Sequence, residues 1–113
     1  MSKHNLFVTA VVTVLFLSGL VWAGTKPRPP IIAMFTSEHC GPCRTAKQVL
    51  QNRAKELQGI EIIYFDRDRD AEVFAKYDVR LTPTFFVGTK DGVVVLQTHN
   101  VWDAIAQAKG LRQ

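Results

Sequence analysis

The run Cys40-Gly41-Pro42-Cys43 constrains the fold more than any other feature, because of what stands on each side of it. Before it, residues 31–35 read IIAMF, an apolar stretch after prolines that predicts a buried strand. After it, apolar residues recur at helical spacing as far as Leu57, which predicts an amphipathic helix. Pro42 fits the first turn of that helix, and Gly59 fits its C-terminal cap. The sequence therefore predicts a strand-to-helix junction that carries both cysteines.

Apolar runs and turn signals predict the rest of the architecture. Crossover helices should make the first strands parallel, whereas an Asp-Gly hairpin signal in residues 89–92 should make the last pair antiparallel. Asp70 suits the N-cap of a short helix, and Trp102 is expected to pack the last helix. We expect an α/β fold of order β-α-β-α-β-β-α, with a central mixed four-stranded sheet flanked by helices. Its later strands are expected at 60–65, 81–87 and 93–98, and its later helices at 71–77 and around Trp102–Leu111.

The position of the cysteines favours disulfide chemistry over a structural cross-link. A bond between residues so close in sequence closes a very small loop, so it constrains the unfolded chain little. At a helix N-terminus, free N–H groups and the helix dipole stabilise an anion, so the pKa of Cys40 should fall below the free value of about 8.5. The thiolate is the nucleophile in disulfide exchange. We therefore predict Cys40 as the attacking thiol and Cys43, one turn into the helix, as the more buried resolving thiol.

Other site chemistries find less support. Structural zinc needs four ligands, and the chain offers 2 cysteines and 3 histidines; a zinc module stays open as the weaker alternative. Asp66, Asp68 and Asp70 resemble the start of a calcium loop. Ala71 and Tyr77 stand where that loop needs Gly and Glu, so we expect no calcium site and no other metal. The net charge of +4 is spread over mixed charges without a basic stripe, which argues against nucleic-acid binding.

The N-terminal segment predicts export. Residues 6–23 are uncharged and mostly apolar and follow Lys3, as in a secretory signal, and cleavage after Ala23 fits the small residues there. An uncleaved membrane anchor is the alternative, since the run is long enough to span a bilayer. A core helix is disfavoured because the run has no polar face. We expect residues 1–23 to be a signal or anchor, 24–30 a proline-rich tether and 31–113 the folded domain, on the periplasmic or other extracytoplasmic side.

A second motif, Leu81-Thr82-Pro83-Thr84, completes a resemblance. Together with Cys40-Gly41-Pro42-Cys43 it resembles the thioredoxin family over about residues 31–110, without the opening strand and helix of full-length members. The resemblance implies that Pro83 forms a cis bond facing the cysteines and that Thr82 offers its backbone to an extended substrate. Gly41 and Pro42 would also contact that substrate. An ordinary trans proline entering a strand is the alternative interpretation.

Several positions depart from the family pattern. His39 and Thr36 stand where the family has tryptophans. Met34 replaces a buried acid that takes the proton of the resolving thiol, and Ile62 replaces the lysine paired with that acid. The proton relay is therefore expected to be absent, with water or Glu38 as acceptor. His39 has two interpretations: an imidazolium that further lowers the pKa of Cys40, or a plain surface residue.

The resemblance implies a thiol–disulfide oxidoreductase that acts on protein thiols and disulfides with no cofactor beyond the Cys40–Cys43 disulfide. Gly41-Pro42 resembles the reducing members, and an exported reductase needs electrons from a membrane redox partner. His39 points instead to a disulfide oxidase or isomerase. The missing acid at Met34 motivates a third alternative, a thioredoxin-fold binding or assembly module whose cysteines are incidental.

Overall fold

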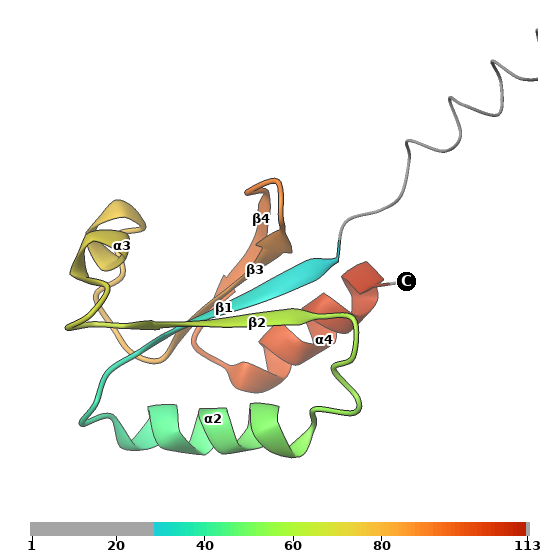
Figure 1. Ribbon diagram of the computed structural model, residues 1–113, viewed down its shortest axis with the longest axis horizontal. Helices are drawn as coiled ribbons and strands as arrows, with labels where there is room; N and C mark the ends of the chain where they lie inside the picture. Colours follow the sequence, from blue (N-terminus) through green and yellow to red (C-terminus); the bar gives the residue numbers. More distant parts are fainter. Residues whose placement is uncertain (1–28, 113) are drawn as a thin grey trace, which may run out of the picture.

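The computed structural model describes residues 29–112 of the chain (Figure 1). The expected export segment, residues 1–23, and most of the expected tether lie outside the described residues. The elements follow the predicted order β-α-β-α-β-β-α. They are β1 (Pro30–Thr36), α2 (Gly41–Asn52), β2 (Glu61–Asp66), α3 (Ala71–Lys76), β3 (Thr84–Thr89), β4 (Val94–Thr98) and α4 (Val101–Arg112).

The strands form one mixed sheet of 4 strands in the order β2-β1-β3-β4, which confirms the predicted sheet. β1 and β2 are parallel, with Ile32 opposite Ile62, and the β3–β4 hairpin is antiparallel. β3 is also antiparallel to β1, so the expectation of parallel first strands holds only for β1 and β2. α3 has 6 residues and is about 9 Å long at 1.5 Å per residue. That is too short to carry the chain back along the sheet, so β3 starts at the end where β2 finishes.

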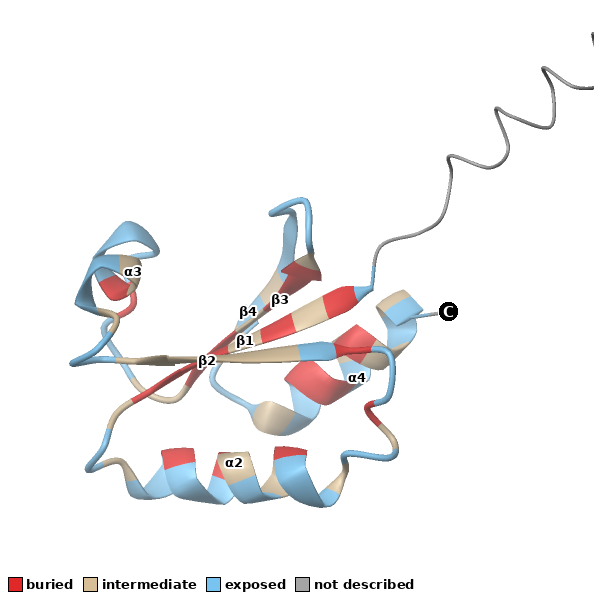
Figure 2. Cartoon of the chain, in the orientation of Figure 1, coloured by how far each residue is buried: buried red, intermediate tan, exposed pale blue. Residues whose placement is uncertain are grey.

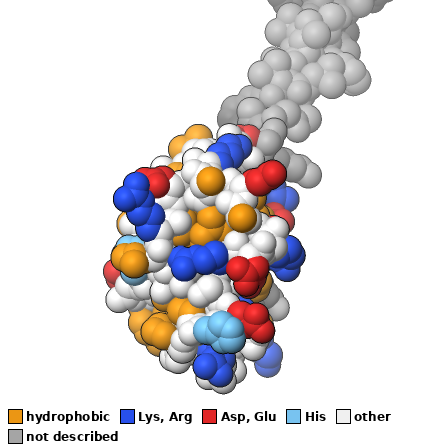
Figure 3. All heavy atoms as spheres, turned by 90° about the vertical axis from the view of Figure 1, so that its left-hand side faces the viewer, with side chains coloured by type: hydrophobic (Ala, Val, Ile, Leu, Met, Phe, Trp, Pro, Cys, Tyr) orange, Lys and Arg blue, Asp and Glu red, His pale blue; other side chains and the backbone are white. Residues whose placement is uncertain are grey.

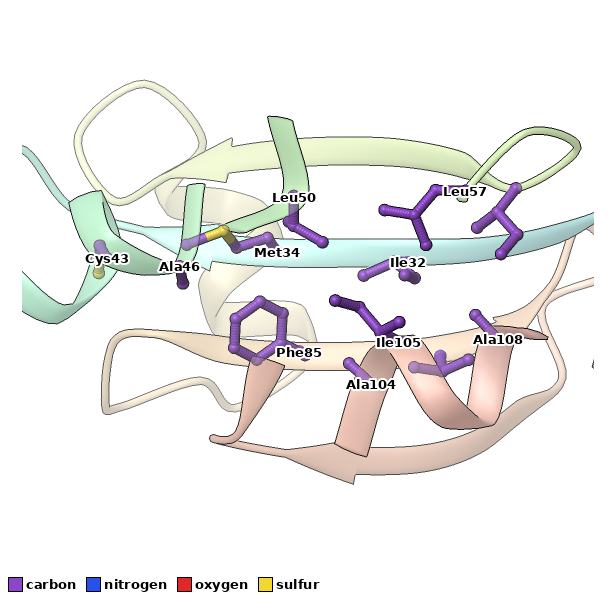
Figure 4. Close-up of a cluster of buried hydrophobic side chains, with 12 residues drawn as sticks. Ile32, Met34, Cys43, Ala46, Leu50, Leu57, Phe85, Ala104, Ile105 and Ala108 are labelled. Atoms are coloured by element: carbon purple, nitrogen blue, oxygen red, sulfur yellow. The ribbon is translucent and has the colours of Figure 1, made fainter. Parts of the chain in front are cut away.

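Alternating side chains of the strands divide the core between the two faces of the sheet. On one face, Ile32 and Met34 of β1 lie under α2 and α4, which cover that face together (Figure 1). Figure 2 shows that the buried residues of both helices lie on the sides turned to the sheet. Figure 4 shows Cys43, Ala46 and Leu50 of α2 meeting this cluster, whose buried members also include Leu57, Ile60, Phe85, Val87, Ala104, Ile105 and Ala108.

The other face carries a smaller aromatic cluster beside α3. Phe35 is 1 % exposed and lies 5.0 Å from Phe74 and 5.2 Å from Phe86, measured between ring centroids. Burying a side chain of this size stabilises the fold by about 1.5–3 kcal/mol. Because Phe35 and Met34 are neighbours on β1 and point to opposite faces, one short strand joins both clusters immediately before the cysteines.

Most element boundaries differ from the sequence prediction by one or two residues, and the differences at β1, α2 and β3 have clear structural reasons. β1 starts at Pro30, which was assigned to the tether; Pro30 is buried and pairs with Thr89. A proline is tolerated there because it is the first residue of the strand. α2 ends at Asn52, and separate turns carry the chain on to Leu57, which remains buried. β3 starts at Thr84 rather than at residue 81, so the proline motif lies in the loop before the strand.

Two residues behave differently from expectation. Asp70 is the N-cap residue of α3, but its side chain does not bond the helix. Its Oδ2 instead accepts hydrogen bonds from the backbone N–H of Asp66 and from Arg69, so it closes the loop before the helix. Trp102 is 50 % exposed rather than packed in the core. No helix within residues 29–112 is both long and apolar enough to cross a membrane.

Candidate active site

Cys40 and Cys43 are joined by a disulfide at the start of α2, with their Cα atoms 5.2 Å apart. Cys40 has extended backbone geometry and is the N-cap of the helix, and its sulfur accepts a hydrogen bond from the backbone N–H of Cys43 at 3.2 Å. Pro42 stands in the first turn, where its missing N–H removes no helical bond. Cys40 therefore occupies the position that normally holds Ser, Asp or Asn, and its sulfur receives the N–H that those side chains would accept.

The two sulfurs differ in access. Cys43 is 1 % exposed and belongs to the core cluster under α2, whereas Cys40 is only half-buried. An external disulfide or thiol can therefore reach the Cys40 sulfur but not the Cys43 sulfur. The more exposed cysteine is thus the one predicted to attack, and the buried one is the one predicted to resolve the mixed disulfide.

The loop before β3 faces the disulfide. The Thr82–Pro83 peptide bond is cis, as the resemblance implied. The Cys40 sulfur lies 3.6 Å from the carbonyl oxygen of Thr82. A disulfide sulfur carries no hydrogen, so this contact becomes a hydrogen bond only when Cys40 is a thiol. Ser37, between β1 and α2, fixes the loop because its Oγ lies 3.1 Å from Oγ1 of Thr82.

His99 supports the same loop, although the sequence offered it only as one of the 3 histidines counted as possible zinc ligands. Its Nδ1 lies 3.1 Å from the carbonyl oxygen of Pro83 and 3.2 Å from Oγ1 of Thr84. The Thr84 hydroxyl donates its hydrogen bond to the carbonyl oxygen of Leu81, so Oγ1 of Thr84 can only accept from His99. Both partners are acceptors here, so Nδ1 of His99 is the donor in this arrangement. No motif marks this residue, because the contact joins the end of β4 to a distant loop.

The two positions of the family's proton relay hold apolar side chains, Met34 and Ile62, that pack against the core. Met34 is 0 % exposed and packs in the same cluster as Cys43 (Figure 4). Ile62 lies opposite Ile32 on the neighbouring strand and packs against the same cluster. The buried polar residues in 29–112 are Thr36 and Thr84, so no buried carboxyl in this range can take a proton from Cys43.

The remaining predicted site residues lie on the surface around Cys40. Glu38 and His39 are exposed in the loop before α2, and neither contributes a hydrogen bond to the disulfide within the described chain. Gly41 and Pro42 are exposed between the cysteines, where a partner can approach them. The plain-surface interpretation of His39 therefore fits its position better than a direct contact with Cys40.

The sequence model described as Thioredoxin matches residues 23–108 of this chain. The chain belongs to the thioredoxin family. It is 40 % identical over 62 residues to thioredoxin H-type of Oryza sativa subsp. indica, a match that covers 55 % of this chain and 50 % of that protein. It is 33 % identical over 69 residues to thioredoxin H-type 1 of Nicotiana tabacum, covering 61 % of this chain and 54 % of that protein. This thioredoxin-family chain thus spans about half the length of these curated relatives.

Solved structures agree with this assignment. The X-ray structure of Fasciola hepatica thioredoxin superposes with a TM-score of 0.64 at 28 % identity, and the match covers 81 % of this chain and 90 % of that one. Within residues 29–112, no group of three or more His, Cys, Asp or Glu side chains is placed to hold a metal ion.

Proposed function

We propose that this chain is a thiol–disulfide oxidoreductase that reduces protein disulfides outside the cytoplasm. The observation that carries the proposal is the asymmetric pair at the start of α2. The Cys40 sulfur is accessible and accepts the N–H of Cys43 at 3.2 Å, while Cys43 is 1 % exposed. A thiolate at this N-cap is stabilised by that N–H and by the helix dipole, which lowers the pKa of a cysteine.

The reaction runs in two exchanges. The Cys40 thiolate attacks one sulfur of a substrate disulfide; the substrate S–S bond breaks, the first substrate thiolate leaves and takes a proton from water, and a mixed disulfide forms at Cys40. Cys43 then loses its proton and attacks the Cys40 sulfur, and the second substrate thiolate departs. Two electrons pass from the cysteine pair to the substrate, and the Cys40–Cys43 disulfide remains.

The loop opposite Cys40 supports the binding of an extended substrate. The Thr82 carbonyl lies 3.6 Å from the Cys40 sulfur, so a chain attached to that sulfur runs beside the Thr82–Pro83 backbone. Backbone groups give affinity to extended peptides of any sequence. Gly41 and Pro42 are exposed on the other side of the sulfur and complete the contact surface.

Direction and location rest on the sequence. The Gly41-Pro42 pair between the cysteines supports a reductase, and the apolar run at residues 6–23 supports export. A reductase outside the cytoplasm has to be recharged after each turnover. We therefore propose a membrane protein with a thiol pair as the electron donor, and no metal or organic cofactor in this chain.

The redox equilibrium of the Cys40–Cys43 pair in glutathione buffers tests the proposal. A reductase requires a potential well below that of the glutathione couple, whereas a potential well above it would mean an oxidase or isomerase. Cys43→Ser should accumulate a mixed disulfide with a substrate protein, and Cys40→Ser, the matched control, should not. If the pair shows no reversible exchange and Cys43→Ser traps nothing, the binding-module alternative favoured by Met34 replaces the enzyme.

A further inference from the structure

His99, the residue that follows β4, reaches across to the loop that faces the disulfide. Its Nδ1 lies 3.1 Å from the carbonyl oxygen of Pro83 and 3.2 Å from Oγ1 of Thr84. The side chain of His99 is exposed, so it adds little to the packed core. Its contribution to the molecule therefore lies in these two contacts, in which one N–H serves two acceptors of a distant loop.

The contacts of His99 extend through the whole loop. The Thr84 hydroxyl donates to the carbonyl oxygen of Leu81, so His99, Thr84 and Leu81 are linked in series. Thr84 is 1 % exposed, and water cannot easily replace a hydrogen-bond partner in so buried a place. The two bonds of His99 thus tie residues 81–84 to the end of β4.

Thr82 is the member of this segment that meets the active site. Its carbonyl oxygen lies 3.6 Å from the Cys40 sulfur, and its Oγ1 lies 3.1 Å from Oγ of Ser37. Ser37 therefore holds Thr82 from the β1–α2 side, and the bond from His99 holds the next residue from the β4 side. Thr82 and Pro83 share one planar peptide group, so a shift of Pro83 moves the Thr82 carbonyl with it.

We propose that His99 is a positioning residue that holds the Thr82 backbone in place for an extended polypeptide substrate on Cys40; this rests on the proposed function. A substrate joined to Cys40 runs past Thr82, and backbone hydrogen bonds between them are directional. Misplacement of a contact by about 1 Å can cost ~10²-fold in rate. A small disulfide without peptide groups forms no such bonds, so the loss of His99 should slow peptide reduction selectively.

The test compares a cysteine peptide disulfide with bis(2-hydroxyethyl) disulfide, which has no peptide group. The purified, reduced chain reacts with each, and the readout is the ratio of the two rate constants, peptide over small disulfide. This ratio cancels changes in the reactivity of Cys40 and in the fraction of folded protein. His99→Ala should lower the ratio about tenfold. The control Val95→Ala changes an exposed residue of β4 and should leave the ratio unchanged.

Two amide variants separate the hydrogen bond from the bulk of the ring. The amide nitrogen of Asn stands as many bonds from the backbone as Nδ1 of His, whereas that of Gln stands one carbon further out. His99→Asn should therefore keep the donor and hold the ratio within about twofold of that of the unaltered chain, and His99→Gln should not.

The outcomes distinguish the role of His99 from the proposed function. An unchanged ratio in His99→Ala, or an Asn variant no better than the Gln variant, overturns the positioning role while the oxidoreductase stands. If the unaltered chain reduces neither disulfide, the proposed function itself is wrong and the role of His99 falls with it.

Discussion

Met34 of β1 and Cys43 of α2 are packed in one buried cluster, with exposed fractions of 0 % and 1 %. The cluster around the resolving cysteine therefore holds a thioether, which cannot accept the proton of a thiol. In a cluster without a buried carboxyl in the described range, we expect the attack of Cys43 on a mixed disulfide to depend on water or on the exposed Glu38 for deprotonation.

Met34→Asp should accelerate that step. A carboxylate in this cluster can take the proton of Cys43, and we expect release of the mixed disulfide at pH 7 to quicken by about tenfold, below the ~10²–10⁴-fold of a well-placed general base. Stopped-flow measurement of release from a preformed Cys40 mixed disulfide gives the rate. Met34→Asn is the matched control because it cannot ionise. Equal acceleration by both variants would contradict the role assigned to proton transfer.

The same variant should change the pH dependence of stability. Burial disfavours the ionised form, so the pKa of the new carboxyl is raised above its unfolded value of about 3.9. Relative to Met34→Asn, Met34→Asp should be most stable at acid pH and lose stability as pH rises through that raised pKa. Urea unfolding at pH 5 and pH 8 measures the difference, which should be absent in the Asn control.

Two buried threonines should respond in opposite ways to removal of the hydroxyl. Thr36 Oγ1 is buried without a hydrogen-bond partner among residues 29–112, whereas Thr84 Oγ1 bonds Leu81 and His99. A buried, unpaired hydroxyl is unfavourable, so Thr36→Val should raise the free energy of unfolding by about 1 kcal/mol. Thr84→Val should lower it by about 1–2 kcal/mol because it leaves its partners unpaired. Urea denaturation compares them; a loss of stability in Thr36→Val would show that its hydroxyl is satisfied.

Two glycines offer a similar contrast. A Cβ on Gly88 would come within 2.3 Å of the Val93 carbonyl oxygen, where β3 turns into β4. Gly88→Ala should therefore destabilise the fold by about 1–3 kcal/mol through overpacking. Gly110 lies in α4 with open space around its Cα, so Gly110→Ala should stabilise by about 0.5–1 kcal/mol. Thermal unfolding of both variants checks the two signs, and a neutral Gly88→Ala would mean that the hairpin can shift to make room.

The ion pairs that Glu56, in the turns after α2, forms with Arg53 and with Lys109 of α4 should make stability depend on acid pH. The hydrogen bond from Lys109, and after it the one from Arg53, hold the pKa of the Glu56 carboxyl below its ordinary value. The stabilisation is therefore present above the unfolded pKa of about 4.3 and is lost as pH falls through the lower folded pKa. The urea midpoint of Glu56→Gln should lie below that of the unaltered chain at pH 7 and merge with it as pH falls below about 4. Glu72→Gln, an exposed acid on α3, is the control.

The strand-to-helix junction and the order of elements were predictable because they depend on local signals. Pro42 and the apolar stripe place α2 within a residue of its observed start, and the Asp-Gly turn places the β3–β4 hairpin. The predicted C-terminal end of α2 was wrong because the spacing of apolar residues indicates which side chains are buried and not whether the backbone is helical. Leu57 is buried as the pattern requires, yet it lies in the turns that follow α2.

The supports of the site were not predictable, because each joins segments far apart in the chain. The bond between His99 and the Pro83 carbonyl spans 16 positions, and no local pattern signals it. Trp102 was expected to pack the last helix. It is instead 50 % exposed, with the guanidinium carbon of Arg53 4.6 Å from its ring centroid, and this contact joins the segment after α2 to the start of α4.

The end of the molecule at which α2 begins carries charges of both signs, as the sequence predicts. Figure 3 views this end and shows acidic and basic side chains interleaved, with hydrophobic side chains between them. A surface of mixed sign does not steer a polyanion toward this end of the molecule.

The helix cap at Cys40 makes the backbone of α2 a reporter of the reaction. The N–H of Cys43 is bonded to the same sulfur that exchanges its covalent partner, so that amide senses each chemical form of the site directly. Its NMR shift and its rate of hydrogen exchange should therefore differ among thiolate, mixed disulfide and internal disulfide. One isotopically labelled amide would follow turnover in the native protein, with no dye attached and no residue replaced.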